Sequence, residues 1–257
     1  MTKAIQKSLR ESAAARWTAL GILSFTMFAG YLFTEIISPL KPMIERVYGW
    51  DGSDFGMFFS AYAWFNVFFL ALIFVGVLLD RFGIRFSTIA SVLTMVVGAG
   101  LKYFAFVTDF GGSEILGFDT QLMLASLGYA LFGVGVEYAG ITVSKSVVKW
   151  FRGKEIALAM GMQVAIARLG SFVPLAFGAA IAAALSVPTA VLLGLLFLVI
   201  GFFGFLVYNA MDRKLDKQDK DATEGLLEED KFKISDLRVI VTNKGFWLIA
   251  ILCVLFY

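Results

Sequence analysis

The sequence predicts an all-α integral membrane protein, and three observations carry this prediction. Hydrophobic residues make up 59% of the 257 residues and charged residues only 16%, whereas soluble domains are about 45–50% apolar and about 25% charged. Uncharged runs are long enough to cross a bilayer: 25 residues separate Asp54 from Asp80, and no charge occurs between Arg168 and Asp212. Lys and Arg gather between such runs. Because lipid offers no hydrogen bonds to the backbone, runs of this length are expected to be helices.

Six membrane-spanning helices are expected. They cover residues 17–39, 54–80, 86–107, 120–148, 156–185 and 189–209. Pro39 ends the first helix, and the turn residues 186–188 separate the last two, because proline interrupts a helix. Lys102 lies near enough to the end of the third helix for its amine to extend to the membrane interface.

The polar segments divide the chain further. We expect a cytoplasmic N-terminus at 1–16, a six-helix transmembrane domain at 17–209, a cytoplasmic linker at 210–244 and the start of a seventh helix at 245–257. Residues 212–231 mix both charge signs, as solvated linkers do, and 232–241 have the apolar spacing of a helix on the membrane surface. Because the seventh apolar run stops in mid-span, we expect the second half of the same chain to be missing.

The distribution of Lys and Arg predicts the orientation. Eighteen of these residues lie in the N-terminus, in the two turns at 80–85 and 145–154, and after the sixth helix, against three on the opposite side. Basic loops stay in the cytoplasm. The prediction is therefore a multi-pass protein, of the bacterial inner (plasma) membrane type, with a cytoplasmic N-terminus.

The composition argues against several other classes. The sequence has no histidine, and Cys253 is its only cysteine, so neither a disulfide framework nor a cysteine-based metal site is expected. The basic residues form no continuous stripe, which argues against nucleic-acid binding. No catalytic constellation is recognisable. We expect no enzyme, no cofactor and no metal.

Two charges lie deep in the hairpin formed by residues 122–174. Glu137 lies 16 residues before Gly153 and Arg168 lies 15 after it, so in antiparallel helices the two share one height. Each is roughly 18–20 Å from the basic turn, past the middle of a hydrocarbon core of about 30 Å. A charge at this depth costs on the order of 2.5–3.5 kcal/mol and by default faces the bundle interior or a watered cavity. A zwitterionic solute would place its carboxylate on Arg168 and its ammonium on Glu137; the alternative is a structural ion pair between the helices.

Small residues accompany both charges at helical spacing. They are Gly133, Gly140 and Ser144 beside Glu137, and Ala157, Gly161 and Ala165 beside Arg168. This pattern predicts close helix packing within the membrane.

The turn between the second and third helices carries a motif. Its residues are Gly76, Asp80, Arg81, Gly83 and Arg85. In sequence and position it resembles the cytoplasmic signature loop of the major facilitator superfamily. The resemblance implies an N-terminal half of that fold, built as two inverted three-helix repeats, followed by the start of helix 7. It also implies alternating access, in which the loop holds the cytoplasmic side closed in one state.

A narrower resemblance covers most of the first five helices. Stretches 59–67, 135–137, 148–155, 161–163 and 167–171 are similar to those of the lysosomal dipeptide-uniporter branch of this superfamily and its bacterial relatives. In that branch the acid of helix 4 and the arginine of helix 5 are implicated in holding a zwitterionic dipeptide. The matching residues here are Glu137 and Arg168.

Four further residues within the predicted helices were considered for the site. Tyr62 and Asn66 share one face of the second helix and are expected to line the cavity, the alternative being helix-packing contacts. Glu35 is a candidate gate or proton site, the alternative being an interfacial residue. Gln163 lies some 140° around its helix from Arg168, so we expect it outside the site.

Together these features predict a secondary transporter that moves a small zwitterionic or anionic solute, with dipeptides favoured, across the bilayer. The alternatives are a proton-coupled organic-anion transporter, in which Arg168 binds and Glu137 carries a proton, and a membrane receptor or assembly subunit that keeps this fold without transport.

Overall fold

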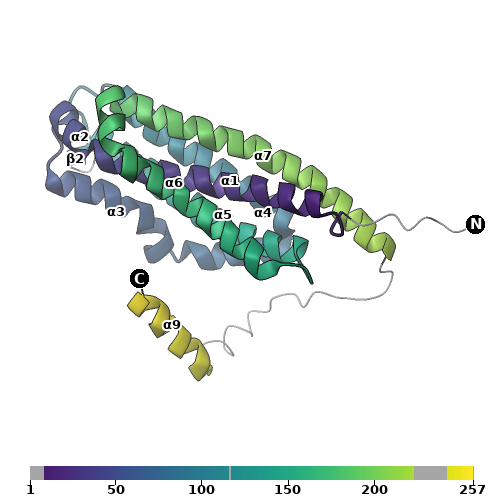
Figure 1. Cartoon of the computed structure of the whole chain (residues 1–257). Helices are drawn as coiled ribbons and strands as arrows, with labels where there is room; N and C mark the ends of the chain where they lie inside the picture. Colours follow the sequence, from purple (N-terminus) through teal and green to yellow (C-terminus); the bar gives the residue numbers. More distant parts are fainter. Residues whose placement is uncertain (1–8, 116, 223–241, 257) are drawn as a thin grey trace, which may run out of the picture. The chain divides into compact units, whose positions relative to one another are not determined.

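The computed structural model describes residues 9–115, 117–222 and 242–256 (Figure 1). The chain divides into two compact units, 1–224 and 225–257. The first unit contains α1 (Ala13–Glu35), the short 3-10 helix η1 (Ser38–Leu40), α2 (Lys41–Tyr48), α3 (Gly52–Phe68), α4 (Ala71–Val107), β1 (Glu114–Ile115), β2 (Phe118–Asp119), α5 (Thr120–Trp150), α6 (Ile156–Ala184) and α7 (Val187–Ala222); the second contains α9 (Lys244–Phe256). The strands form one small antiparallel hairpin between α4 and α5.

Polar residues at the predicted turns start or end several of these helices. The Asp51 carboxylate accepts bonds from the amides of Ser53 and Asp54, which forms a capping box at the start of α3. Asp119 caps α5 through the amide of Leu122. Gly49, with φ 71°, ends α2 in the left-handed conformation that glycine adopts at little cost. The helix boundaries therefore follow local turn chemistry.

The packing of the first unit confirms the predicted bundle of two inverted three-helix repeats. α1 packs on α6 and α7, and α5 packs on α3 and α4. If the first three spans are matched to the last three, the contacts of α1 with α6 and α7 correspond to those of α5 with α3 and α4, as inverted repeats require. Where α4 crosses α5, a side chain on Gly98 of α4 would clash with the backbone of α5, and one on Gly128 of α5 with the backbone of α4. Figure 1 shows the long helices α1, α5, α6 and α7 lying side by side.

The second predicted span is not one continuous helix. α3 ends at Phe68, Leu70 has φ 49°, and α4 then begins at Ala71 and continues through the signature loop to Val107. Gly83, with φ 78° and ψ 176°, is the non-helical residue that divides α4 where the turn was expected. Five described helical segments are long and apolar enough to cross a membrane; α3 is not among them because of the break at Leu70.

Several predicted boundaries were wrong. The first helix runs from Ala13 to Glu35 rather than over 17–39, and α7 continues to Ala222 rather than ending at 209. Part of the predicted linker is therefore helical. The remainder of that linker, including the predicted surface helix at 232–241, lies outside the described residues.

Lys102 does not extend to the interface as predicted. Its side chain is fully buried, and Nζ lies 4.1 Å from the ring centroid of Tyr129, 4.5 Å from that of Phe33 and 5.2 Å from that of Phe58. The rings come from three different helices, so the amine is enclosed within the bundle.

The close packing predicted for the small-residue face of α6 is not seen in the described part of the chain. Ala157, Gly161 and Ala165 are exposed, and a Cβ built on Gly161 would touch nothing within 4 Å. In the described part of the chain this face has no helix packed on it. By contrast, Gly133 of α5 lies against the Tyr62 backbone, as close packing predicts.

Candidate functional site

A pocket of about 300 Å³ lies between α1, α5 and α6 and contains both predicted charges. Its lining residues are Met27 and Tyr31 of α1, Glu137, Gly140, Ile141 and Ser144 of α5, and Gln163, Val164, Ala167 and Arg168 of α6. α6 packs mainly on α1 rather than on α5, so the pocket opens between the two arms of the hairpin with α1 as its wall.

A tyrosine of a fourth helix orients Glu137. The Tyr62 hydroxyl of α3 donates a hydrogen bond of 2.9 Å to Glu137 Oε1. The Tyr62 ring packs between Tyr129 and Phe132, with centroid distances of 5.5 and 6.5 Å. Tyr62 is not itself part of the pocket lining. Tyr62 therefore contacts the Glu137 carboxylate from outside the pocket.

Arg168 contacts an aromatic ring and not a carboxylate. Its guanidinium carbon lies 5.3 Å from the ring centroid of Tyr31, within the range of a cation–π contact. Among the described residues no ion pair joins Arg168 to Glu137 or to any other acid. A negative and a positive group therefore line one pocket without neutralising each other.

Gln163 lies in the pocket wall, against our expectation. Its side chain is only 5% exposed, yet it lines the pocket together with Arg168. The prediction failed because the angle of 140° would exclude a residue from a narrow groove, whereas this pocket also extends along the face of α6 toward α1.

Asn66 and Glu35 lie elsewhere. Neither residue lines the pocket. Asn66 Oδ1 is buried without a hydrogen-bond partner in the described chain. Glu35 is the last residue of α1, and its Oε2 accepts a bond of 3.0 Å from the Ser38 hydroxyl.

The signature loop makes ion pairs with two other helices. Asp80 Oδ1 accepts from Lys145 Nζ of α5 at 2.9 Å, and Arg85 donates to Asp216 Oδ2 of α7 at 2.9 Å. Arg81 lies over the ring of Phe82 at 5.4 Å. A Cβ built on Gly76 would meet nothing within 4 Å. The loop thus links the second and third spans to α5 and α7.

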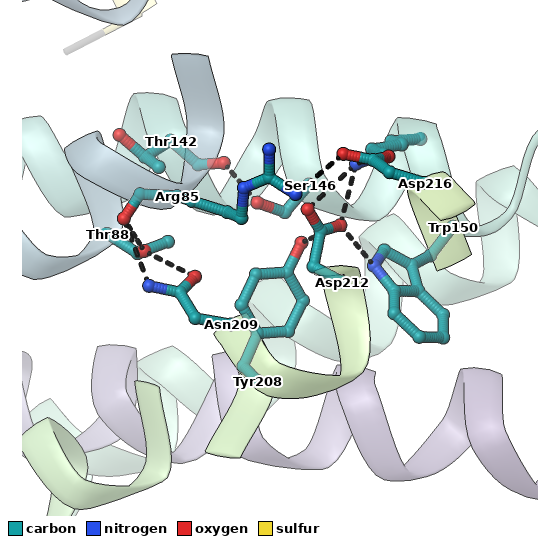
Figure 2. A network of polar contacts seen from close by, with 10 residues as sticks. Arg85, Thr88, Thr142, Ser146, Trp150, Tyr208, Asn209, Asp212 and Asp216 are labelled. Carbon is teal, nitrogen blue, oxygen red and sulfur yellow. Dashed lines mark hydrogen bonds and ion pairs between the residues drawn. The ribbon is translucent and has the colours of Figure 1, made fainter. Parts of the chain in front are cut away.

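A second polar cluster lies beside this loop (Figure 2). Asp212 of α7 is 1% exposed, and both its carboxylate oxygens accept from Lys149 Nζ at 2.8 Å. The Trp150 indole donates to Asp212 Oδ1 at 3.1 Å, and the Tyr208 hydroxyl donates to the same oxygen at 3.4 Å. Lys149 also pairs with Asp216 at 2.7 Å.

This cluster was not predicted, because Asp212 and Asp216 lie in the segment expected to be a solvated linker. One signal could have found them: Tyr208, Asp212 and Asp216 are spaced four residues apart, which places them on one helical face. The Asn209 amide completes the contact between α7 and α4. Its nitrogen donates to the carbonyl of Arg85 at 3.0 Å, and its oxygen accepts from the Thr88 hydroxyl at 2.9 Å.

Sequence comparison agrees with the bundle and its loop. The sequence profile of the Major Facilitator Superfamily matches residues 23–257. The chain belongs to this superfamily and is a multi-pass membrane protein.

Relatives of this chain are named as lysosomal dipeptide transporters. The chain is similar to the lysosomal dipeptide transporter MFSD1 of Bos taurus and of Homo sapiens, each 28% identical over 253 residues, which is 95% of this chain and 51% of the relative. The Mus musculus protein of that name is 31% identical over 162 residues, or 62% of this chain and 32% of the relative. The chain thus spans about half the length of the curated relatives that it matches most fully.

Proposed function

We propose that the protein is part of a secondary transporter that carries small zwitterionic solutes, dipeptides foremost, by alternating access. The observation that carries this proposal is the shared pocket of Glu137 and Arg168, in which neither charge has an opposite partner among the described residues. The similarity to proteins named as lysosomal dipeptide transporters supports the choice of solute.

The chemistry of the pocket suits a dipeptide. The guanidinium of Arg168 offers a planar fork to a carboxylate, and the Glu137 carboxylate offers acceptors to an ammonium. A ligand carrying both groups would supply each residue with the partner that it lacks. A volume of about 300 Å³ lies at the small end of ligand pockets, which favours a short peptide over a large solute.

We also propose the placement in the membrane. The basic turns, with Lys145 to Lys154 and the signature loop, lie on the cytoplasmic side of a plasma or inner membrane, together with the N-terminus. The second half of the transporter packs against the exposed small residues of α6, because Ala157, Gly161 and Ala165 permit close backbone approach. The signature loop then holds that side closed in one state.

The test is binding and uptake by the full-length protein. We expect glycylglycine to raise the melting temperature of the purified protein and to enter proteoliposomes. Glu137→Gln and Arg168→Gln should each weaken glycylglycine binding at least about tenfold, because a hydrogen bond to a charged group contributes about 1.5–3 kcal/mol. Glu45→Gln is the control, since Glu45 is an exposed carboxylate of α2 that pairs with Lys41 at 3.7 Å.

Other outcomes would favour the rival functions. If Arg168→Gln abolished binding of organic anions, while Glu137→Gln abolished gradient-driven uptake but left counterflow exchange intact, an anion transporter coupled to protons would replace the dipeptide transporter. If uptake were flat for every peptide and anion tried, a receptor or assembly subunit with this fold would be favoured.

A further inference from the structure

Gln163 is an uncharged polar side chain of the pocket that makes no hydrogen bond within the described part of the chain. Glu137 accepts from Tyr62, the Ser144 hydroxyl donates to the Gly140 carbonyl at 2.9 Å, and Arg168 lies over the Tyr31 ring. In the described part of the chain the Gln163 carboxamide has no hydrogen-bond partner, although the residue is only 5% exposed. The carboxamide is not among the polar groups sealed from solvent without a partner, so it is reachable from the pocket, where a ligand can bond to it.

The position of Gln163 places it beside a solute held by the two charges. It precedes Arg168 by five residues, which is about 7.5 Å along α6. Side chains of a helix tilt toward its N-terminus, so the Arg168 side chain extends along α6 in the direction of Gln163. The opposite wall at that level is formed by Gly140 and Ser144 of α5. A Cβ built on Gly140 would meet only Met27 Cε, at 3.7 Å, which leaves room for a solute between the helices.

We infer that Gln163 recognises the peptide bond of the solute and thereby selects dipeptides over other zwitterions. This inference rests on the proposed function. A primary carboxamide offers one carbonyl acceptor and two N–H donors, so it can accept from the N–H of a peptide bond while donating to its C=O. Glu137 and Arg168 read only the two ends of the solute, which many amino acids also possess. Gln163 supplies the contact that those solutes cannot satisfy.

The test compares two solutes with the same charges and reach. δ-Aminovalerate has the ammonium and carboxylate of glycylglycine and the same number of chain atoms between them, but methylenes replace its peptide bond. Two neutral hydrogen bonds of about 1 kcal/mol each correspond to roughly thirtyfold in affinity. We expect the full-length protein to bind glycylglycine at least about tenfold more tightly than δ-aminovalerate, measured by competition against a labelled dipeptide.

The decisive variant is Gln163→Met, which keeps the length of the side chain and removes its polar atoms. It should lose most of the preference for glycylglycine while binding δ-aminovalerate within about twofold of the unmodified protein, and this retained binding also shows that the variant folds. Gln121→Met is the matched control. Gln121 Nε2 donates to the Ala105 carbonyl at 2.9 Å, outside the pocket, so this change should leave the preference intact.

The failures are distinguishable. If the unmodified protein bound neither solute, the proposed function and the inference would both fall. If it bound both but Gln163→Met left the preference unchanged, or weakened both solutes equally, or bound neither, only the role of Gln163 would be overturned. The zwitterion site of Glu137 and Arg168 would then stand.

Discussion

Lys102 shows how a charged residue type can be buried inside the bundle without an ion pair. Its Nζ has no hydrogen-bond partner in the described chain and lies among the rings of Phe33, Phe58 and Tyr129. A desolvated cation–π contact contributes about 2 kcal/mol, whereas a buried amine without hydrogen bonds costs several kcal/mol. The two effects are of similar size.

Replacement of this lysine by a near-isosteric apolar residue should therefore be tolerated. We expect Lys102→Met to leave the melting temperature of the detergent-solubilised protein unchanged or to raise it by a few degrees. Lys41→Met is the control, because Lys41 lies over Phe55 at 5.5 Å but is exposed; it should change stability by less than about 0.5 kcal/mol. A large drop in melting temperature for Lys102→Met alone would mean that the aromatic contacts outweigh the cost of burial.

The hydroxyl of Tyr62 gives a second prediction at this scale. Tyr62→Phe removes the hydrogen bond to Glu137 and keeps the ring that packs on Tyr129. We expect glycylglycine affinity to fall by roughly three- to tenfold, because a hydrogen bond to a charged acceptor is lost but the carboxylate remains. Isothermal titration measures this change. Tyr103→Phe, at a tyrosine that packs against the core, should have no effect on affinity; equal losses in both variants would contradict the role of Tyr62.

The two charged residues of the pocket were predictable from sequence, whereas Gln163 was not. A carboxylate or guanidinium deep in a membrane span is costly unless it faces the bundle interior or a watered cavity, so Glu137 and Arg168 were recognisable from their depth alone. A glutamine carries no such penalty, and its position depends on the width of a pocket built by three helices. Asn66 was expected to line the cavity but does not, because the lining comes from α1, α5 and α6, whereas Asn66 lies on α3.

At the scale of elements, α7 is joined to α5 through the buried carboxylate of Asp212. Asp212→Asn should destabilise the protein by about 1.5–3 kcal/mol, since it removes charge-assisted hydrogen bonds at a site that is 1% exposed, while Lys149 keeps its pair with Asp216. Thermal unfolding measures the loss. Asp216→Asn is the matched control: Asp216 is 31% exposed and pairs with Lys149 and Arg85, so its loss should cost about 1 kcal/mol or less. Equal effects would show that burial does not set the strength of these pairs.

The helices themselves follow from hydropathy, but their ends and breaks do not. Six apolar runs located the six spans, and capping residues such as Asp51 and Asp119 mark where helices start. Where α7 continues past residue 209, its Asp212 contacts Lys149 and Trp150 of α5; the helical spacing of Tyr208, Asp212 and Asp216 indicates a helix there but does not identify these partners. The break at Leu70 occurs within an apolar run with neither glycine nor proline nearby, so it could not be predicted from local residue types.

At the scale of the molecule, the distribution of basic residues predicts which ends of the helices face the cytoplasm. With Cys253 replaced by serine, a cysteine at Arg152, in the basic turn, should react with a membrane-impermeant maleimide only after permeabilisation of cells. A cysteine at Ser53, at the start of α3, should react in intact cells. Both residues are exposed, so access to the reagent and not burial decides the result. The reverse pattern would overturn the proposed orientation.

The left-handed residue Leu70 separates two tasks along one stretch of chain. On its N-terminal side, α3 carries Tyr62, which holds Glu137; on its C-terminal side, the first part of α4 carries Asp80, which pairs with Lys145. A continuous helix would transmit any tilt of the loop rigidly to the tyrosine, through about 27 Å of α-helix over 18 residues. If the protein works as the proposed transporter, the bend at Leu70 would let the loop move without pulling the Tyr62 hydroxyl from the Glu137 carboxylate. Solute binding and closure of the loop would then change at different moments of the proposed transport cycle.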